Sequence, residues 1–159
     1  ANYNEQLQRI WHEFEEENGD IPNSAREAVA WGVKRGLIDV PEVDPLDQLA
    51  EDMARALREE YRTDKYGRKY RINHAVRKSK AGVQYTLWGR MDAQPREFMA
   101  MSYGQRRKAI VGDCFQLKTD VDVYNDKNPQ NEPISLVLDF TDDVEEEQTI
   151  RRRGKDNAA

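Results

Sequence analysis

The chain has 159 residues, 30 of them acidic and 25 basic, so its formal net charge is −5. Apolar residues make up 38 % of the chain, and no apolar run approaches the roughly 18 residues that a membrane span requires. The single cysteine, Cys114, excludes an intrachain disulfide framework and a multi-cysteine zinc site. With no charged-then-apolar leader either, we expect a cytoplasmic chain without a membrane span, and we expect no cofactor and no metal.

The charges are segregated along the chain. Residues 62–90 hold nine basic residues against a single acid, Asp64, whereas residues 1–61 and 91–150 each carry a large excess of acids. Such an asymmetry indicates an anionic partner. The alternative is that the basic stretch packs against acidic helices of the same chain, and the sequence alone leaves both interpretations open.

A first helix is predicted over about residues 4–18. Its apolar residues recur at helical spacing, at positions i, i+3, i+4 and i+7: Leu7, Ile10, Trp11 and Phe14. Acidic residues lie largely on the other side of this helix, and Gly19 is a plausible end. The pattern predicts an amphipathic helix with one buried face.

Two further helices are marked by their end signals. Ser24 followed by Glu27 is typical of a capping box, and Gly36 is typical of the left-handed residue that follows a helix. Asp44 and Pro45 predict the start of a third helix, which continues to about residue 61. The apolar residues that we expect to face inward in this third helix are Leu46, Leu49, Met53 and Leu57.

Residues 68–91 change to a period of two, which predicts a β-hairpin. The residues 79–82 supply the turn, and a four-residue loop places Lys78 opposite Val83. In this register Val76 lies opposite Tyr85 on an apolar face, and Arg71 lies opposite Arg90 on a polar, basic face. His74 falls on the apolar face, which favours a buried histidine over a ligand.

A long fourth helix is predicted from about Pro95 to before Asn128. Seven of its residues follow a 4-3 spacing: Tyr103, Arg107, Ile110, Cys114, Leu117, Val121 and Tyr124. This spacing is typical of a coiled-coil seam, although an ordinary buried helix of a bundle also produces it. Residues 103–124 are therefore a candidate surface for another protein or for a second copy of the chain.

The remaining chain is predicted to hold one more strand and a tail. Ile134, Leu136, Leu138 and Phe140 alternate with less apolar neighbours, so that this strand could extend the hairpin. Residues 141–159 are rich in charge and poor in apolar side chains, which predicts a flexible tail. We therefore expect a mainly helical α+β fold, with one globular domain over residues 1–140.

The polar face of the hairpin is the candidate binding site. Its residues, with the turn, are Lys69, Arg71, Asn73, Arg77, Lys80, Gln84, Trp88 and Arg90. Two arginines directly opposite each other repel, and phosphates would relieve that repulsion. Trp88 offers a flat ring on which a base could stack. We expect a non-enzymatic protein that binds DNA or RNA as a regulator or accessory subunit.

The order of three helices and a basic two-stranded hairpin over residues 4–91 resembles a winged helix–turn–helix. This resemblance implies binding to DNA. The third helix, however, begins with Asp47, Glu51 and Asp52, which the DNA phosphates would repel. If this module contacts DNA, we expect the hairpin to make the contact rather than the helix.

Two alternatives remain. The first is an adaptor that binds proteins through its acidic helices and residues 103–124. The second is a metal-dependent nuclease, whose chemistry needs converging carboxylates. Its candidate residues are Asp113, Lys118, Asp120, Asp122 and Asp139.

Overall fold

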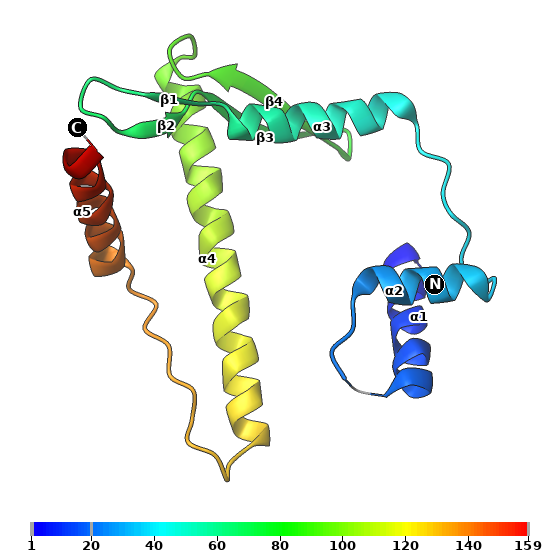
Figure 1. Ribbon diagram of the computed structural model, residues 1–159. Helices are drawn as coiled ribbons and strands as arrows, with labels where there is room; N and C mark the ends of the chain where they lie inside the picture. The colour runs from blue at the N-terminus through cyan, green and yellow to red at the C-terminus, as the bar shows by residue number, and fades with distance from the viewer. Residues whose placement is uncertain (1, 20, 159) are drawn as a thin grey trace. The chain divides into compact units, whose positions relative to one another are not determined.

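The computed structural model describes residues 2–19 and 21–158, with side chains up to residue 154 (Figure 1). The helices are α1 (Tyr3–Asn18), α2 (Ala25–Lys34), α3 (Pro45–Glu59), α4 (Arg96–Lys127) and α5 (Thr141–Ala158). The strands are β1 (Tyr61–Thr63), β2 (Lys69–Arg71), β3 (Asn73–Lys80) and β4 (Val83–Arg90). The fold is thus α+β and mainly helical, as the sequence predicts.

Contacts between residues group the chain into two compact units, Ala1–Ala50 and Glu51–Ala159. The first unit contains α1, α2 and the start of α3. The second contains the end of α3, both pairs of strands, α4 and α5. The single domain that we expected over residues 1–140 stays a prediction.

Helices α1 and α2 pack through a small apolar core. Ile10, Phe14 and Ala28 are buried, and the rings of Phe14 and Trp31 pack in a T-shaped arrangement with 5.8 Å between their centroids. Gly32 permits this close approach, since a Cβ atom there would lie 2.8 Å from Ile10 Cγ2. The inward stripe predicted for the first helix is confirmed at Ile10 and Phe14, which are buried, whereas Leu7 and Trp11 are half-buried.

The predicted helix ends are also present. The Ser24 hydroxyl accepts a hydrogen bond from the backbone N–H of Glu27 at 3.1 Å. Gly36 adopts a φ of +72°, and the N–H of Leu37 donates to the carbonyl of Gly32, which is the pattern of a Schellman motif. Asp44 accepts from the N–H of Leu46 at 3.0 Å, so α3 begins at Pro45 as expected.

The prediction that the apolar stripe of α3 is buried is wrong. Leu46, Leu49 and Met53 were expected to face inward, but all three are exposed, and only Leu57 near the C-terminal end is half-buried. Periodicity identifies the apolar face of a helix. It does not supply the element that would cover that face.

The β3/β4 hairpin is present, but the predicted register is wrong by two residues. Lys80 pairs with Val83, so that the loop has two residues instead of four. Ala81 and Gly82 both have positive φ, +52° and +77°, as a type I′ turn requires. Val76 therefore lies opposite Leu87, and Asn73 lies opposite Arg90. Because the shift is an even number, the two faces keep the residues predicted for them.

A second, shorter hairpin precedes the first and was not predicted. Strands β1 and β2 pair antiparallel, with Tyr61 opposite Arg71 and Thr63 opposite Lys69. Ile72 separates β2 from β3. Its N–H donates to the carbonyl of Glu60, and its carbonyl accepts from the N–H of Met91. The chain thus changes its pairing partner at one residue, and Arg71 belongs to β1/β2 rather than opposite Arg90.

Helix α4 spans the predicted residues and lies against β3. Within the described part of this helix, Ser102 is the buried residue. Along the predicted seam, Tyr103, Ile110, Leu117 and Tyr124 are exposed. The interpretation of α4 as an ordinary buried helix of a bundle is therefore wrong, while pairing with another chain stays a prediction.

The C-terminal region does not form the strand that we predicted. Residues 134–140 are extended but form no strand, because they make no ladder with either hairpin. Thr141–Ala158 form α5, while the flexibility that we expected of residues 141–159 stays a prediction. The Asp139 carboxylate accepts from the N–H of Thr141 at 3.1 Å at the start of this helix. A capped N-terminus and a pair between Glu147 and Arg151 favour the helix locally.

The resemblance to a winged helix–turn–helix is not confirmed, because the β1/β2 hairpin intervenes between α3 and the longer hairpin. In the described residues, no helix combines the length and apolar character needed to cross a bilayer.

Candidate nucleic-acid interface

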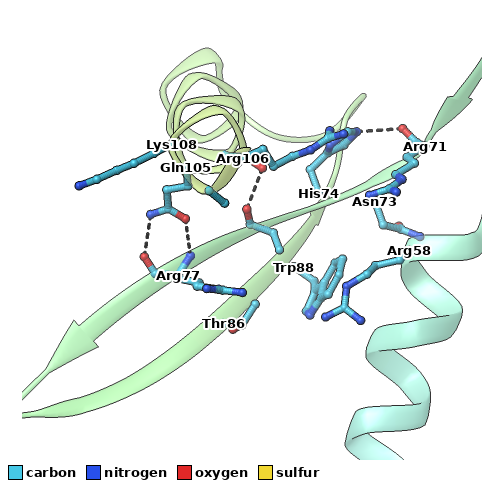
Figure 2. Close-up of a pocket in the computed structure, with 13 residues that line it drawn as sticks. Arg58, Arg71, Asn73, His74, Arg77, Thr86, Trp88, Gln105, Arg106 and Lys108 are labelled. Carbon is cyan, nitrogen blue, oxygen red and sulfur yellow. Dashed lines mark hydrogen bonds between the residues drawn. The ribbon is translucent and has the colours of Figure 1, made fainter. Parts of the chain in front are cut away.

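A cleft of about 450 Å³ lies where β3, β4, the end of α3 and the start of α4 meet. Its lining includes five basic residues and no acidic residue. These five, the cleft cations, are Arg58, Arg71, Arg77, Arg106 and Lys108. Trp88 and Thr86 of β4 complete the opposite wall (Figure 2).

Helix α4 is fixed to β3 by polar side chains. The Ser102 hydroxyl donates to the carbonyl of Ala75 at 2.7 Å. The Gln105 side chain accepts from the N–H of Arg77 at 2.8 Å and donates to its carbonyl at 2.9 Å (Figure 2). These bonds hold the backbone of Arg77 while its side chain remains exposed beside the cleft.

The end of α3 is fixed to the same strand. The buried Asn73 side chain donates to the carbonyl of Leu57 at 3.2 Å and to the Glu60 carboxylate at 2.8 Å. This contact brings Arg58, one residue beyond Leu57, over the ring of Trp88, with 5.6 Å from Cζ to the ring centroid (Figure 2). Such a cation–π contact contributes about 0.5–1 kcal/mol at an exposed site and orients both side chains.

His74 forms part of the floor of the cleft. Its side chain is 4 % exposed, its Nε2 lies 2.8 Å from the carbonyl of Arg71, and its ring meets Tyr103 edge-on. The imidazole is thus satisfied by a backbone group and packed against an aromatic ring. The interpretation of His74 as a buried structural residue is confirmed.

The charge of the cleft is not compensated within the described part of the chain. None of the five cleft cations forms an ion pair there, although other arginines such as Arg35 and Arg68 do. Glu60 lies beside the wall, and its carboxylate accepts from Asn73. A concave surface that gathers positive charge in this way attracts anions, and guanidinium groups match phosphate oxygens in pairs.

The structure brings four of the eight predicted site residues to the cleft: Arg71, Asn73, Arg77 and Trp88. The other four do not line it. Lys69 lies in β2 with its Nζ 4.7 Å from the centroid of the Tyr61 ring, and Arg90 pairs with Asn73. Lys80 and Gln84 lie at the turn end of the hairpin.

Sequence reasoning missed the contribution of α3 and α4, above all Arg58, Arg106 and Lys108. The signal on α4 is a stripe at helical spacing, formed by Ser102, Gln105, Arg106 and Ala109. A search for apolar periodicity passes over it, because the face that contacts β3 is mostly polar.

The carboxylates of the nuclease hypothesis do not gather. Asp120 accepts from Gln116, Asp122 pairs with Lys118, and Asp139 caps α5, where bonds from the Thr141 backbone and side chain lower the pKa of that carboxyl. Among the described residues, no group of three or more His, Cys, Asp or Glu side chains is placed to hold a metal ion.

Comparison with known proteins gives no further guide: no family model matches this chain, and no curated protein or solved structure is significantly similar to it.

Proposed function

We propose that this chain is a non-enzymatic nucleic-acid-binding protein, a regulator or accessory subunit, whose cleft holds backbone phosphates. The observation that carries the proposal is the set of five cleft cations with no acidic residue in the lining. The five cations repel one another when no anion is bound, and the phosphates of a nucleic acid would relieve that repulsion. Binding would also release the counterions that surround the nucleic acid, which adds to the affinity.

The size of the cleft supports a local phosphate contact rather than the enclosure of a whole duplex. A cleft of about 450 Å³ suits a ligand of small-molecule size. Trp88 adds a ring surface beside the cations, as in proteins that combine phosphate contacts with base stacking.

The test is binding of fluorescent DNA and RNA oligonucleotides, measured by anisotropy over a series of salt concentrations. The affinity should fall as salt rises. The logarithmic slope should become shallower by about one for each phosphate contact removed. Arg77→Glu and Arg106→Glu should each lower the affinity about tenfold or more, because each replaces a cation of the cleft by an anion.

Lys127→Glu provides the matched control. Lys127 ends the same helix as Arg106 but does not line the cleft, so this variant makes the same change in net charge at a distance. If Lys127→Glu and Arg106→Glu lowered the affinity equally, net charge would explain the effect, and the assignment of the cleft as the binding site would be contradicted. Absence of binding at low salt would overturn the proposed function.

A second candidate function, a protein-interaction adaptor, is favoured by the exposed apolar side chains of α4. Ile110, Phe115 and Leu117 are all exposed, Phe115 at 71 %. Solvent-exposed groups of this kind mark interaction surfaces when they are contiguous. Light scattering coupled to size-exclusion chromatography tests self-association, and Ile110→Lys with Leu117→Lys should then restore the monomer mass. A monomer at every concentration would exclude the second copy as the partner.

A further inference from the structure

The β1/β2 hairpin combines exposed aromatic rings with cations. Residues 61–71, here called the tyrosine hairpin, hold five bases and one acid, Asp64. Lys69 and Arg71 lie 4.7 and 6.0 Å from the centroid of the Tyr61 ring. Lys65 and Arg68 lie 5.1 and 5.3 Å from the centroid of the Tyr66 ring. Each ring is therefore accompanied by two positive charges.

The rings remain accessible despite these contacts. Tyr66 is 71 % exposed and Tyr61 is 40 % exposed. Aromatic side chains are usually buried for their large apolar area, so an exposed ring at a loop tip gains little stability for the fold. The tip places Tyr66 where a planar ligand can reach it.

Asp64 organises the loop and leaves most of the positive charge uncompensated. Its carboxylate accepts from the N–H groups of Tyr66 and Arg68 at 3.0 and 2.8 Å, and from Nε of Arg68 at 2.7 Å. These bonds, led by the one from the Arg68 backbone, hold the pKa of Asp64 below its ordinary value. In the described structure, no ion pair involves Arg62, Lys65 or Lys69.

Arg71 connects the tyrosine hairpin to the cleft. Its Nε donates to the hydroxyl of Tyr61 at 3.3 Å, and the same residue lines the cleft. From Lys69 to Arg77 the chain is extended apart from Ile72, which at about 3.3 Å per residue gives a path of up to about 26 Å. The two sites are therefore parts of one track rather than separate patches.

We propose that the tyrosine hairpin stacks unpaired bases, so that the ligand is single-stranded nucleic acid with its phosphates along the track from Lys69 to Arg77. Stacking on tyrosine requires bases with an open face, which the interior of a duplex does not offer. This inference rests on the proposed function, since it assigns the ligand class of the same site.

A structural interpretation of the same contacts is that the cations merely stabilise a short hairpin. The two interpretations differ in one measurable respect. Stacking adds affinity only when the ligand has bases, whereas a structural role affects every anionic ligand alike. An abasic sugar–phosphate strand therefore separates them.

The experiment compares three ligands of the same length, about 12 nucleotides: a single strand, a duplex and an abasic strand. Anisotropy should rank the single strand first, with an affinity about tenfold above that of the abasic strand. Tyr66→Leu should lower the affinity for the single strand toward that of the abasic strand, and should leave abasic binding unchanged. Tyr3→Leu, at an exposed tyrosine of α1, is the matched control and should change neither.

Tyr66→Trp keeps the inference falsifiable if the leucine variant loses the hairpin. A larger ring should raise the affinity for the single strand and leave abasic binding unchanged. Equal binding of all three ligands, or a preference for the duplex, would overturn the stacking inference while the proposed function stands. If no ligand bound at low salt, the proposed function itself would fail.

Discussion

Two tryptophan–arginine pairs in this chain have the same components and different surroundings. In the first unit, Arg35 lies 4.7 Å from the centroid of the Trp31 ring. In the second, Arg58 lies 5.6 Å from the centroid of the Trp88 ring. Glu17 completes the first pair, because it binds both the Trp31 indole N–H and the Arg35 guanidinium. No carboxylate completes the second pair within the described residues.

The difference separates a structural use of charge from the binding use that we propose for the cleft. Glu17 neutralises Arg35, so that this pair closes the contact between α1 and α2. Arg58 keeps its charge directed into a cleft with four other cations. Whether a basic residue stabilises the fold or remains available to an anionic ligand therefore depends on whether the chain supplies a carboxylate beside it.

We expect the greatest change in stability when the apolar core beside Trp31 and Arg35 is disrupted. Phe14→Ala should lower the free energy of unfolding of the α1/α2 pair by about 3 kcal/mol, because it leaves a cavity between Ile10 and Trp31. Hydrogen exchange of the α2 amides measures this loss. Oligonucleotide affinity should stay unchanged. A parallel loss of binding would contradict the separate roles of the two pairs, because it would show that the two regions depend on each other.

An intermediate effect is expected when the missing carboxylate is supplied to the second pair. Thr86 lines the cleft on β4 and is exposed, so Thr86→Glu places a carboxylate among the cations. The affinity for oligonucleotides should fall about tenfold, which corresponds to about 1.4 kcal/mol. Thr86→Gln introduces a side chain of the same shape as glutamate but without the charge, so this variant should bind oligonucleotides nearly as tightly as the parent protein does. If both variants bound equally, the charge would not be the determinant.

The smallest effect concerns Asp64, the acid that the basic stretch uses structurally. Its pKa is lowered by the backbone N–H and side chain of Arg68, so the ionised form stabilises the loop. A lowered pKa in the folded state means that this contribution is present at neutral pH and is lost as pH falls through the folded value. NMR titration should place the transition below that of an ordinary aspartate and show the amide of Arg68 shifting with it. A transition at the ordinary value would contradict the hydrogen-bonded loop.

The parts of the fold that were predictable are those encoded by local signals. Ser24, Gly36 and Asp44 mark helix ends through bonds to residues within four positions, and the alternation of residues 73–90 assigns the hairpin faces. The register was not predictable in the same way. Ala81 adopts a positive φ that alanine rarely takes, so no residue preference pointed to a two-residue turn.

The other wrong predictions arose because the periodicity of a segment does not show which element packs against it. Residues 134–140 alternate between apolar and less apolar side chains, as a strand does. Leu46, Leu49 and Met53 recur at helical spacing, as a buried stripe does. Neither pattern identifies the element that would pair with the segment or cover it. For the site, half of the predicted residues line the cleft. The cations of α3 and α4 enter it because Asn73 attaches α3 to β3, and Ser102 and Gln105 attach α4.

The bonds from α4 have one more consequence, for how the sheet can grow. Ser102 and Gln105 occupy outward-facing backbone groups of Ala75 and Arg77, which would otherwise be free to template a further strand. Helix α4 thus blocks the addition of a strand along β3 at these residues. On β4, the Arg90 carbonyl is also occupied, because it accepts from the N–H groups of Ala93 and Gln94. A strand added to this sheet would therefore meet more occupied backbone groups along β3 than along β4.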